Sequence, residues 1–186
     1  QVSGFIDYNN LIYASAKLNG EWGLIEFKYI DDKIYYRDFY SRSDISNISN
    51  ITVFNDDIYI LSSKRILSGN PFNEHISYWE NPMPDLSDDI IDFSSDENNL
   101  FVLTKSAIHQ LFRDKSIEVF INNNSNLGSI KRISILDNNL YAISDSSIFR
   151  ISKNELTSLY QDSSLYFADI ESDKDNLWLA TDYGLG

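Results

Sequence analysis

The sequence predicts an all-β fold, a β-propeller built of four-stranded blades. The first observation is a pattern that recurs five times, in which polar turn residues precede an apolar strand that contains one aromatic residue. These aromatic residues are separated by 46, 42, 40 and 37 positions and are Tyr13, Tyr59, Phe101, Tyr141 and Trp178. A period near forty residues that is made only of short strands is typical of a propeller.

The polarity of the strands is the second observation. The segments 58–61 and 100–103 are apolar at every position, which predicts strands buried on both faces, as inner strands between neighbouring blades would be. The segment 116–120 alternates in polarity, which predicts a solvated outer strand. The third observation is that no window keeps a helical apolar stripe for more than about two turns.

The strands follow in order along each unit. Asn-Asn, Asp-Asp and Asp-Asn pairs between the runs tolerate the positive φ of tight hairpins. The expected strands are 2–8, 11–16, 23–29 and 33–40; 48–54, 58–62, 65–68 and 75–79; 90–95, 100–104, 107–112 and 116–121; 130–136, 140–144, 147–151 and 156–160; and finally 167–172 and 177–181.

We therefore expect one propeller domain over residues 1–186, with about four and a half blades. A ring closes by pairing its last blade with its first, so we expect the domain to be incomplete at its C-terminus. It would then be part of a larger ring, for example a seven-bladed one. A closed four-bladed ring with extra strands is the alternative. An incomplete ring would expose apolar blade faces and favour self-association.

Composition restricts the function. The net charge is −13, which argues against a nucleic-acid backbone as the main partner, because phosphate binding needs clustered Lys and Arg. The chain has no cysteine, which excludes disulfides, thiolate metal sites and a cysteine nucleophile. No apolar run is long enough to insert in a membrane. The sequence begins at Gln1, and removal of a signal peptide would explain this start, as would the choice of expressed segment.

The segment 173–185 resembles the repeat of two-component regulator propellers, which has the form Asp-x-x-Gly/Asn-Leu-Trp-Ile-Gly/Ala-Thr-x-x-Gly-Leu. In this repeat Trp178 would fill the gap between blades, Ala180 would keep the inner strands close, and Gly184 would permit a turn. The other four units keep only the Asn-Leu-aromatic core of the motif, or less.

The resemblance points to two kinds of bacterial protein. The weak early repeats and the start at Gln1 are more similar to the N-terminal propeller of PorZ-like components of the type IX secretion system. The second choice is the periplasmic sensor region of hybrid two-component regulators, which respond to polysaccharide fragments. Both resemblances imply a location outside the cytoplasm, in the periplasm or at the cell surface of a Bacteroidetes-like bacterium.

No motif indicates catalysis, so we expect no enzyme activity, no cofactor and no metal. The two histidines, His75 and His109, lie in different units without carboxylates at ligand spacing. The stretch 173–176 is similar to the start of a calcium loop but lacks its later Gly and Glu. The many aspartates stand mostly at turns, where they are expected to be solvated.

A binding surface is the remaining candidate site. The loops after the second strands of the first three units carry basic residues, and propeller symmetry places equivalent loops on one face. That face would attract an anionic glycan or an acidic protein segment, with aromatic rings available for stacking. The candidate residues are Lys17, Trp22, Lys64, Arg65, Lys105 and Tyr183. Trp79, beside two prolines, is expected to pack beneath its loop instead.

From these observations the sequence predicts a non-catalytic interaction module outside the cytoplasm. As a secretion or cell-surface scaffold it would bind protein partners or an anionic glycan. As a periplasmic sensor domain it would bind a ligand for a distant kinase.

Overall fold

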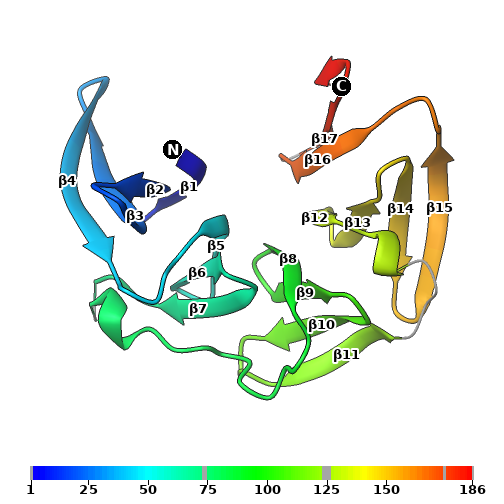
Figure 1. Ribbon diagram of the computed structural model, residues 1–186, viewed down its shortest axis with the longest axis horizontal. Coiled ribbons are helices and arrows are strands. Elements are labelled where there is room, and N and C mark those ends of the chain that lie inside the picture. The colour runs from blue at the N-terminus through cyan, green and yellow to red at the C-terminus, as the bar shows by residue number, and fades with distance from the viewer. Residues whose placement is uncertain (1, 73–74, 123–126, 174, 186) are drawn as a thin grey trace. The chain divides into compact units, whose positions relative to one another are not determined.

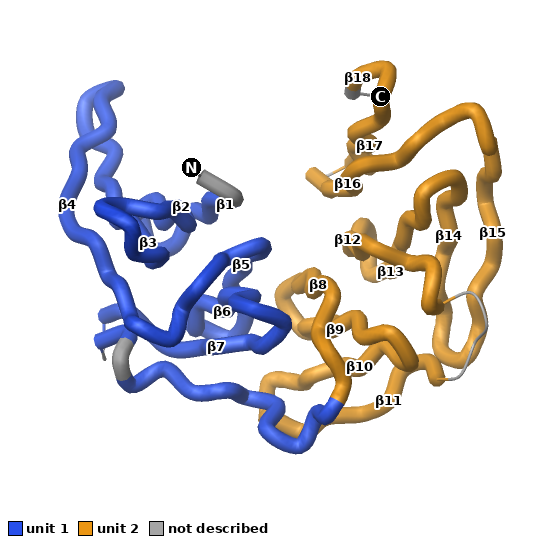
Figure 2. The backbone as a smooth tube through the Cα atoms, viewed as in Figure 1, with its two compact units in different colours: residues 1–87 blue, residues 88–186 orange. Residues whose placement is uncertain are grey.

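A computed structural model describes residues 2–72, 75–122, 127–173 and 175–185 (Figure 1). The chain divides into two compact units, residues 1–87 and 88–186, which are treated separately below (Figure 2). The described residues form antiparallel sheets with two short 3₁₀ turns as the helical elements. Within them no helix has the length and apolar character needed to cross a membrane. One domain over residues 1–186 stays a prediction.

Sheet 1, the first sheet of unit 1, has four strands in chain order. They are β1 (Val2–Tyr8), β2 (Leu11–Leu18), β3 (Glu21–Ile30) and β4 (Lys33–Ser41). β3 and β4 are longer than the expected segments 23–29 and 33–40 and form a long hairpin. The side chains of β4 do not alternate between buried and exposed, because every residue from Lys33 to Asp38 is exposed.

Sheet 2 completes unit 1 with three strands, β5 (Ile48–Phe54), β6 (Asp57–Ser62) and β7 (Arg65–Gly69). The strand expected at 75–79 is wrong, because a 3₁₀ turn, η1 (Ile76–Tyr78), takes its place. A single bridge between Ser68 and Glu80 is the remnant of a fourth strand. Burial of Ile76, Trp79 and Met83 explains the difference, since a regular strand would alternate its side chains away from the core.

Unit 2 contains sheets 3, 4 and 5, again with strands in chain order. Sheet 3 consists of β8 (Ile90–Ser95), β9 (Asn99–Thr104), β10 (Ala107–Phe112) and β11 (Ile117–Asn122). Sheet 4 consists of β12 (Arg132–Leu136), β13 (Asn139–Ile143), β14 (Ser147–Ser152) and β15 (Glu155–Gln161), after the 3₁₀ turn η2 (Leu127–Ser129). Sheet 5 consists of β16 (Phe167–Ser172), β17 (Leu177–Thr181) and the short β18 (Gly184–Leu185). Lys174 of the resembling repeat lies outside the described residues.

The tight turns form as their sequences predict. Pairs of consecutive residues with positive φ connect strands at Asn9-Asn10, Asp31-Asp32, Asn55-Asp56 and Asp137-Asn138. Asn and Asp tolerate the left-handed conformation because their short polar side chains bond locally. Two positive-φ residues give the twist that a two-residue antiparallel hairpin needs, which fixes the register of each pair of strands.

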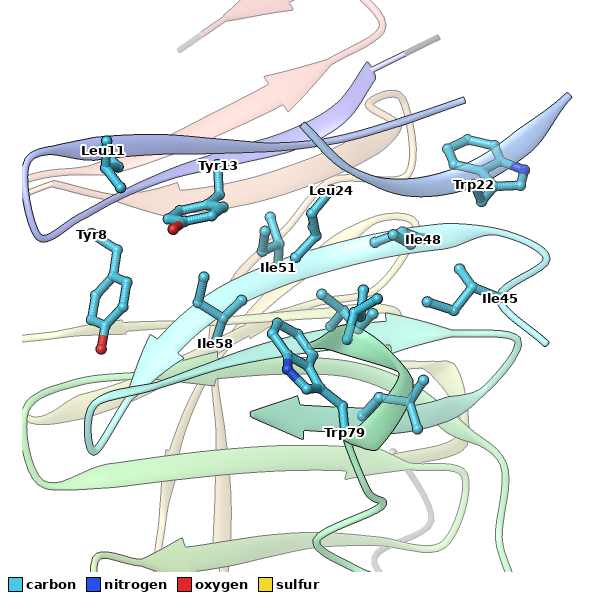
Figure 3. Close-up of a cluster of buried hydrophobic side chains, with 13 residues drawn as sticks. Tyr8, Leu11, Tyr13, Trp22, Leu24, Ile45, Ile48, Ile51, Ile58 and Trp79 are labelled. Carbon is cyan, nitrogen blue, oxygen red and sulfur yellow. The ribbon is translucent and has the colours of Figure 1, made fainter. Parts of the chain in front are cut away.

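The second strands supply much of the core. β6 and β9 are buried over almost their whole length, as their continuous apolar runs predict. In unit 1 the facing sides of sheets 1 and 2 bury a cluster that contains Tyr13, Leu24, Ile51 and Trp79 (Figure 3). In unit 2 a second cluster joins sheets 3 and 4 through Leu103, Ile133 and Phe149.

The five aromatic residues that gave the period all lie on second strands, as predicted. Tyr13 and Tyr59 are buried, whereas Trp178 is 42% exposed. First strands of successive sheets also pack beside one another, β1 with β5 in unit 1 and β12 with β8 and β16 in unit 2. Each unit is therefore a stack of radially repeated sheets, the arrangement of propeller blades.

Candidate functional site

The hairpins between second and third strands form the candidate surface. In unit 1 they are the turns Asn19-Gly20 and Ser63-Lys64, both built of two positive-φ residues. The strands on either side hold these turns at the same end of sheets 1 and 2, because β1 and β5 run side by side. Side chains next to the two turns therefore share one end of unit 1.

Lys17 lies at the end of β2 rather than in the following loop, and it is exposed. It pairs across the ladder with Trp22, the candidate stacking residue. Trp22 is only 8% exposed and packs with Ile45 and Ile48 in the core of unit 1 (Figure 3). Its ring therefore offers no open face to a ligand, and Lys17 is the member of this hairpin that faces water.

The second hairpin presents Lys64 and Arg65, which are both exposed. Nearby, Arg42 forms an ion pair with Asp44 at 2.6 Å and donates to the carbonyl of Trp79 at 2.6 Å. The hydrogen bond from Arg42 holds the pKa of the Asp44 carboxyl below its usual range, and the positive charge of Arg65 adds to the effect. Glu21 of the first hairpin also lies at this end, so four cationic side chains (Lys17, Arg42, Lys64 and Arg65) stand against the two carboxylates of Glu21 and Asp44, although the chain as a whole is acidic.

The equivalent hairpins of unit 2 differ in charge. Lys105 is exposed in the turn between β9 and β10, but the next two turns carry Asp145 and Asp182. Tyr183 follows Asp182 and is 80% exposed, so its ring is open to a ligand. In unit 2 these hairpin ends thus carry both charges, and the basic character predicted for the loops is confined to Lys105.

Lys131 and Tyr166 form a cluster at the same hairpin end that sequence reasoning did not find as a pair. The Lys131 ammonium lies 3.7 Å from the centre of the Tyr166 ring and 2.7 Å from Asp145 Oδ1. The Tyr166 N–H donates to Asp182 Oδ1 at 3.1 Å, and the Asp182 N–H donates to the Tyr166 carbonyl at 3.1 Å. The Tyr166 ring is half exposed and contacts Lys131, whereas the Asp182 bonds hold the Tyr166 backbone; Asp145 and Asp182 make the cluster one of mixed charge rather than a basic one.

One position of the first strands carries a polar residue in four of the five sheets. In each sheet, the second-strand residue two positions after the periodic aromatic residue pairs with one residue of the first strand. From sheet 1 to sheet 5 these first-strand residues are Gly4, Asn50, Asp92, Arg132 and Asp169. Four of these follow an irregularity in the strand, which is typical of a β-bulge. In unit 2 Asp92 accepts from the Ile133 N–H at 2.9 Å, and Arg132 pairs with Asp169 at 3.3 Å. These contacts connect the first strands of sheets 3, 4 and 5.

Sheet 1 contains a buried carboxylate. Glu26 accepts from the hydroxyls of Tyr13 at 2.9 Å and Tyr40 at 2.8 Å, and it pairs with Arg37 at 2.9 Å. Burial, followed by the hydrogen bond to Glu26, raises the pKa of both tyrosines. Every carboxylate oxygen has a donor, so the cluster is a satisfied structural network.

Neither histidine indicates a metal site. His75 is exposed, and burial lowers the pKa of His109 on β10. Over the described ranges, no group of three or more His, Asp or Glu side chains is arranged to hold a metal ion.

Comparison with known proteins shows the fold. No family model matches the chain. No curated protein matches it by sequence. A streptogramin B lyase structure is similar with a TM-score of 0.69 at 15% identity, over 96% of this chain and 61% of that one. The extracellular domain of the putative hybrid two-component system BT4673 from B. thetaiotaomicron is similar with a TM-score of 0.66 at 18% identity, over 97% of this chain and 25% of that one.

PorZ, a bacterial surface component of the type-IX secretion system of Porphyromonas gingivalis, is similar with a TM-score of 0.57 at 9% identity, over 99% of this chain and 36% of that one. The chain spans less than two thirds of the length of each of these structures. The predicted β-propeller fold is confirmed. Propellers support catalysis and binding alike, so this likeness defines the fold class and leaves the function to the site.

Proposed function

We propose that this chain is a non-catalytic propeller module outside the cytoplasm that binds an acidic partner through the second-to-third hairpins of unit 1. The observation that carries the proposal is the exposure of Lys17, Lys64 and Arg65 at the same end of neighbouring sheets in an acidic chain. The partner is an acidic protein segment or an anionic glycan, as expected of a secretion or cell-surface scaffold. The likeness to PorZ supports this role at the level of the fold.

A sensor domain is the second candidate. The specific observation is that the extracellular domain of BT4673 matches with a higher TM-score and identity than PorZ does. In a sensor the same module would bind a soluble ligand and pass the binding energy to a distant output domain. Both candidates place the chain in the periplasm or at the cell surface.

The test is a titration of the chain with a sulfated glycosaminoglycan oligosaccharide, with neutral dextran as the control ligand. The variant Lys17→Ser/Lys64→Ser/Arg65→Ser should bind about tenfold more weakly, because each exposed ion pair contributes about 0–1 kcal/mol. The matched control, Lys28→Ser/Lys115→Ser/Lys153→Ser, removes the same charge from other exposed positions and should bind like the parent.

The salt dependence of binding measures the electrostatic contribution to affinity. Affinity should fall between roughly 50 and 300 mM salt, because exposed charges are screened over that range. Equal affinity of the two triple variants would contradict the proposed surface, and so would binding of neutral dextran as tight as that of the sulfated ligand.

A further inference from the structure

β4, the outer edge strand of sheet 1, exposes more large apolar side chains than the other strands of unit 1. β4 pairs with β3 on one side and forms the edge of its sheet (Figure 2). Ile34 is 62% exposed, Tyr35 49% and Tyr36 59%, and Tyr29 on β3 is exposed beside them. A long edge strand with apolar side chains is a surface to which another strand can pair.

Backbone groups are available at this edge. The two-residue turn Asp31-Asp32 makes Ile30 and Lys33 the closing pair of the hairpin, and such a pair is hydrogen-bonded. Hydrogen-bonded and non-hydrogen-bonded pairs alternate along an antiparallel ladder. The N–H and C=O groups of Ile34 and Tyr36 are therefore directed outward, toward the free edge.

Ladder register sorts the side chains of β4 onto two faces. Lys33, Tyr35 and Asp38 pair with alternate residues of β3 and share one face. Ile34 and Tyr36 share the other face with Tyr29 and Phe27. Asp38 joins the first row because the register shifts at Arg37, which adds one residue to β4 as a bulge does.

Arg37 does not disturb this arrangement. Its guanidinium lies 2.9 Å from the buried Glu26 carboxylate, so its charge is balanced within sheet 1. The exposed row has Lys33 at one end, next to the turn residues Asp31 and Asp32, and Asp38 at the other, and Lys28 of β3 pairs with Tyr35 between them; all of these are exposed.

We propose that β4 pairs with β4 of a second copy of this chain, antiparallel and about a two-fold axis at Tyr35. On one face, Tyr35 then lies opposite Tyr35 of the second copy. On the same face, Lys33 lies opposite Asp38 of the second copy, and by symmetry Asp38 lies opposite Lys33 at the other end. The other face aligns Ile34 with Tyr36 in both directions. Outward backbone groups of Ile34 and Tyr36 meet as hydrogen-bonded pairs, so the edge is complementary to itself.

Buried area agrees with a weak dimer. A tyrosine side chain has about 150–250 Å² to bury, so half-exposed Tyr29, Tyr35 and Tyr36 supply about 300 Å² per copy. With Ile30 and Ile34, the exposed apolar area of the two copies comes to about 1,000 Å², and strand pairing covers only part of it because Tyr29 and Ile30 lie on β3, so the interface is smaller than a standard specific one. The dimer should therefore depend on protein concentration.

Cysteine cross-linking tests the axis, because the natural sequence has no cysteine. In the Tyr35→Cys variant the two sulfur-bearing residues face each other as a non-hydrogen-bonded pair, with Cα atoms about 4.5 Å apart, which suits a disulfide. In the Ile34→Cys control the two cysteines are diagonal neighbours at about 7–8 Å, which is too far. Under mild oxidation Tyr35→Cys should give at least about tenfold more linked dimer than Ile34→Cys.

Charge reversal tests the register by sedimentation velocity. Lys33→Asp and Asp38→Lys should each raise the dissociation constant of the dimer by about tenfold or more, because each places like charges opposite at both ends. The double variant Lys33→Asp/Asp38→Lys should restore it, and an equimolar mixture of the two single variants should form a heterodimer. Glu155→Lys on β15 changes the charge as much as Asp38→Lys and should leave the dimer unchanged.

Three results would overturn the inference: a monomer at every concentration, equal cross-linking of both cysteine variants, or a dimer insensitive to the reversals. A monomer that binds a strand from another protein would also overturn it. Circular dichroism checks that each variant keeps its sheets. None of these results depends on whether the chain binds a sulfated ligand.

Discussion

The buried Glu26 network should be the most sensitive polar site in unit 1. In Glu26→Ala the Tyr13 hydroxyl, on a fully buried side chain, loses its acceptor, which costs about 1–3 kcal/mol. Tyr40 loses a second hydrogen bond in a partly buried place, at about 1 kcal/mol. Arg37 is half exposed and returns to water at little cost. We expect the free energy of unfolding of unit 1 to fall by about 3 kcal/mol.

Urea unfolding followed by tryptophan fluorescence measures this change. Trp22 and Trp79 lie in unit 1 and Trp178 in unit 2, so a Trp178→Phe background makes the emission report on unit 1. With a slope of about 2 kcal/mol per molar urea, the midpoint should fall by about 1.5 M. Lys28→Ser, at an exposed position of the same strand, is the control and should cost less than about 1 kcal/mol, whereas Arg37→Gln should cost more because it leaves the buried Glu26 carboxylate without its counter-charge.

A double-mutant cycle tests the cause of the loss. In a Tyr13→Phe background the fully buried hydroxyl is absent and Glu26→Ala removes the acceptor of the partly buried Tyr40 hydroxyl alone, so the substitution should cost about 1–2 kcal/mol less than it does in the parent. A cost below about 1 kcal/mol in the parent, or strict additivity in the cycle, would refute the reasoning.

Three further predictions concern single residues. Asp92→Ala should lower the stability of unit 2 by about 1–3 kcal/mol, measured by urea unfolding, because the buried Ile133 N–H loses its acceptor; an unchanged midpoint would contradict this. Burial, with a smaller effect of Asp57, raises the pKa of Tyr59 to about 12, whereas an unfolded tyrosine has a pKa of about 10. The native state keeps the Tyr59 proton to a higher pH than the unfolded state does, so the free energy of unfolding should fall by about 2–3 kcal/mol between about pH 10 and 12 because of this residue. In Tyr59→Phe the free energy of unfolding should fall less over the same pH range. Trp79→Ala should cost about 3–5 kcal/mol and Trp178→Ala clearly less, because the first indole is buried and the second is partly exposed; equal losses in thermal melts would count against the assigned burial.

Local chemistry made most of the fold predictable. Tight turns such as Asn9-Asn10 and Asp31-Asp32 need residues that tolerate positive φ, and such pairs are visible in the sequence. Continuous apolar runs such as those of β6 and β9 predict strands with both faces covered, which the structure confirms. Because period, turn chemistry and polarity agree, the sequence specifies the sheets consistently at each level.

The site was less predictable because it depends on contacts between distant residues. Trp22 resembles an exposed loop aromatic in the sequence, but Ile45 and Ile48, beyond the end of β4, help to cover it. The segment 75–79 has the composition of a strand, yet burying Ile76 and Trp79 together favours a 3₁₀ turn. Both outcomes are tertiary effects that outweigh local propensity.

β-Bulges explain the remaining side-chain positions that the sequence did not predict, and these positions bear on binding. One extra residue in β4 moves Asp38 onto the face of Lys33 and Tyr35, which creates the self-complementary edge. Similar irregularities on first strands bring Asn50, Asp92 and Asp169 to one repeated position. A bulge adds one residue to one strand, so it redirects side chains and shifts the register by one residue while the antiparallel ladder continues. Four of the five sheets thus keep one backbone irregularity on the first strand while the residue at that position varies, so differences in binding between such chains should be sought there and in the hairpin ends rather than in the apolar strands.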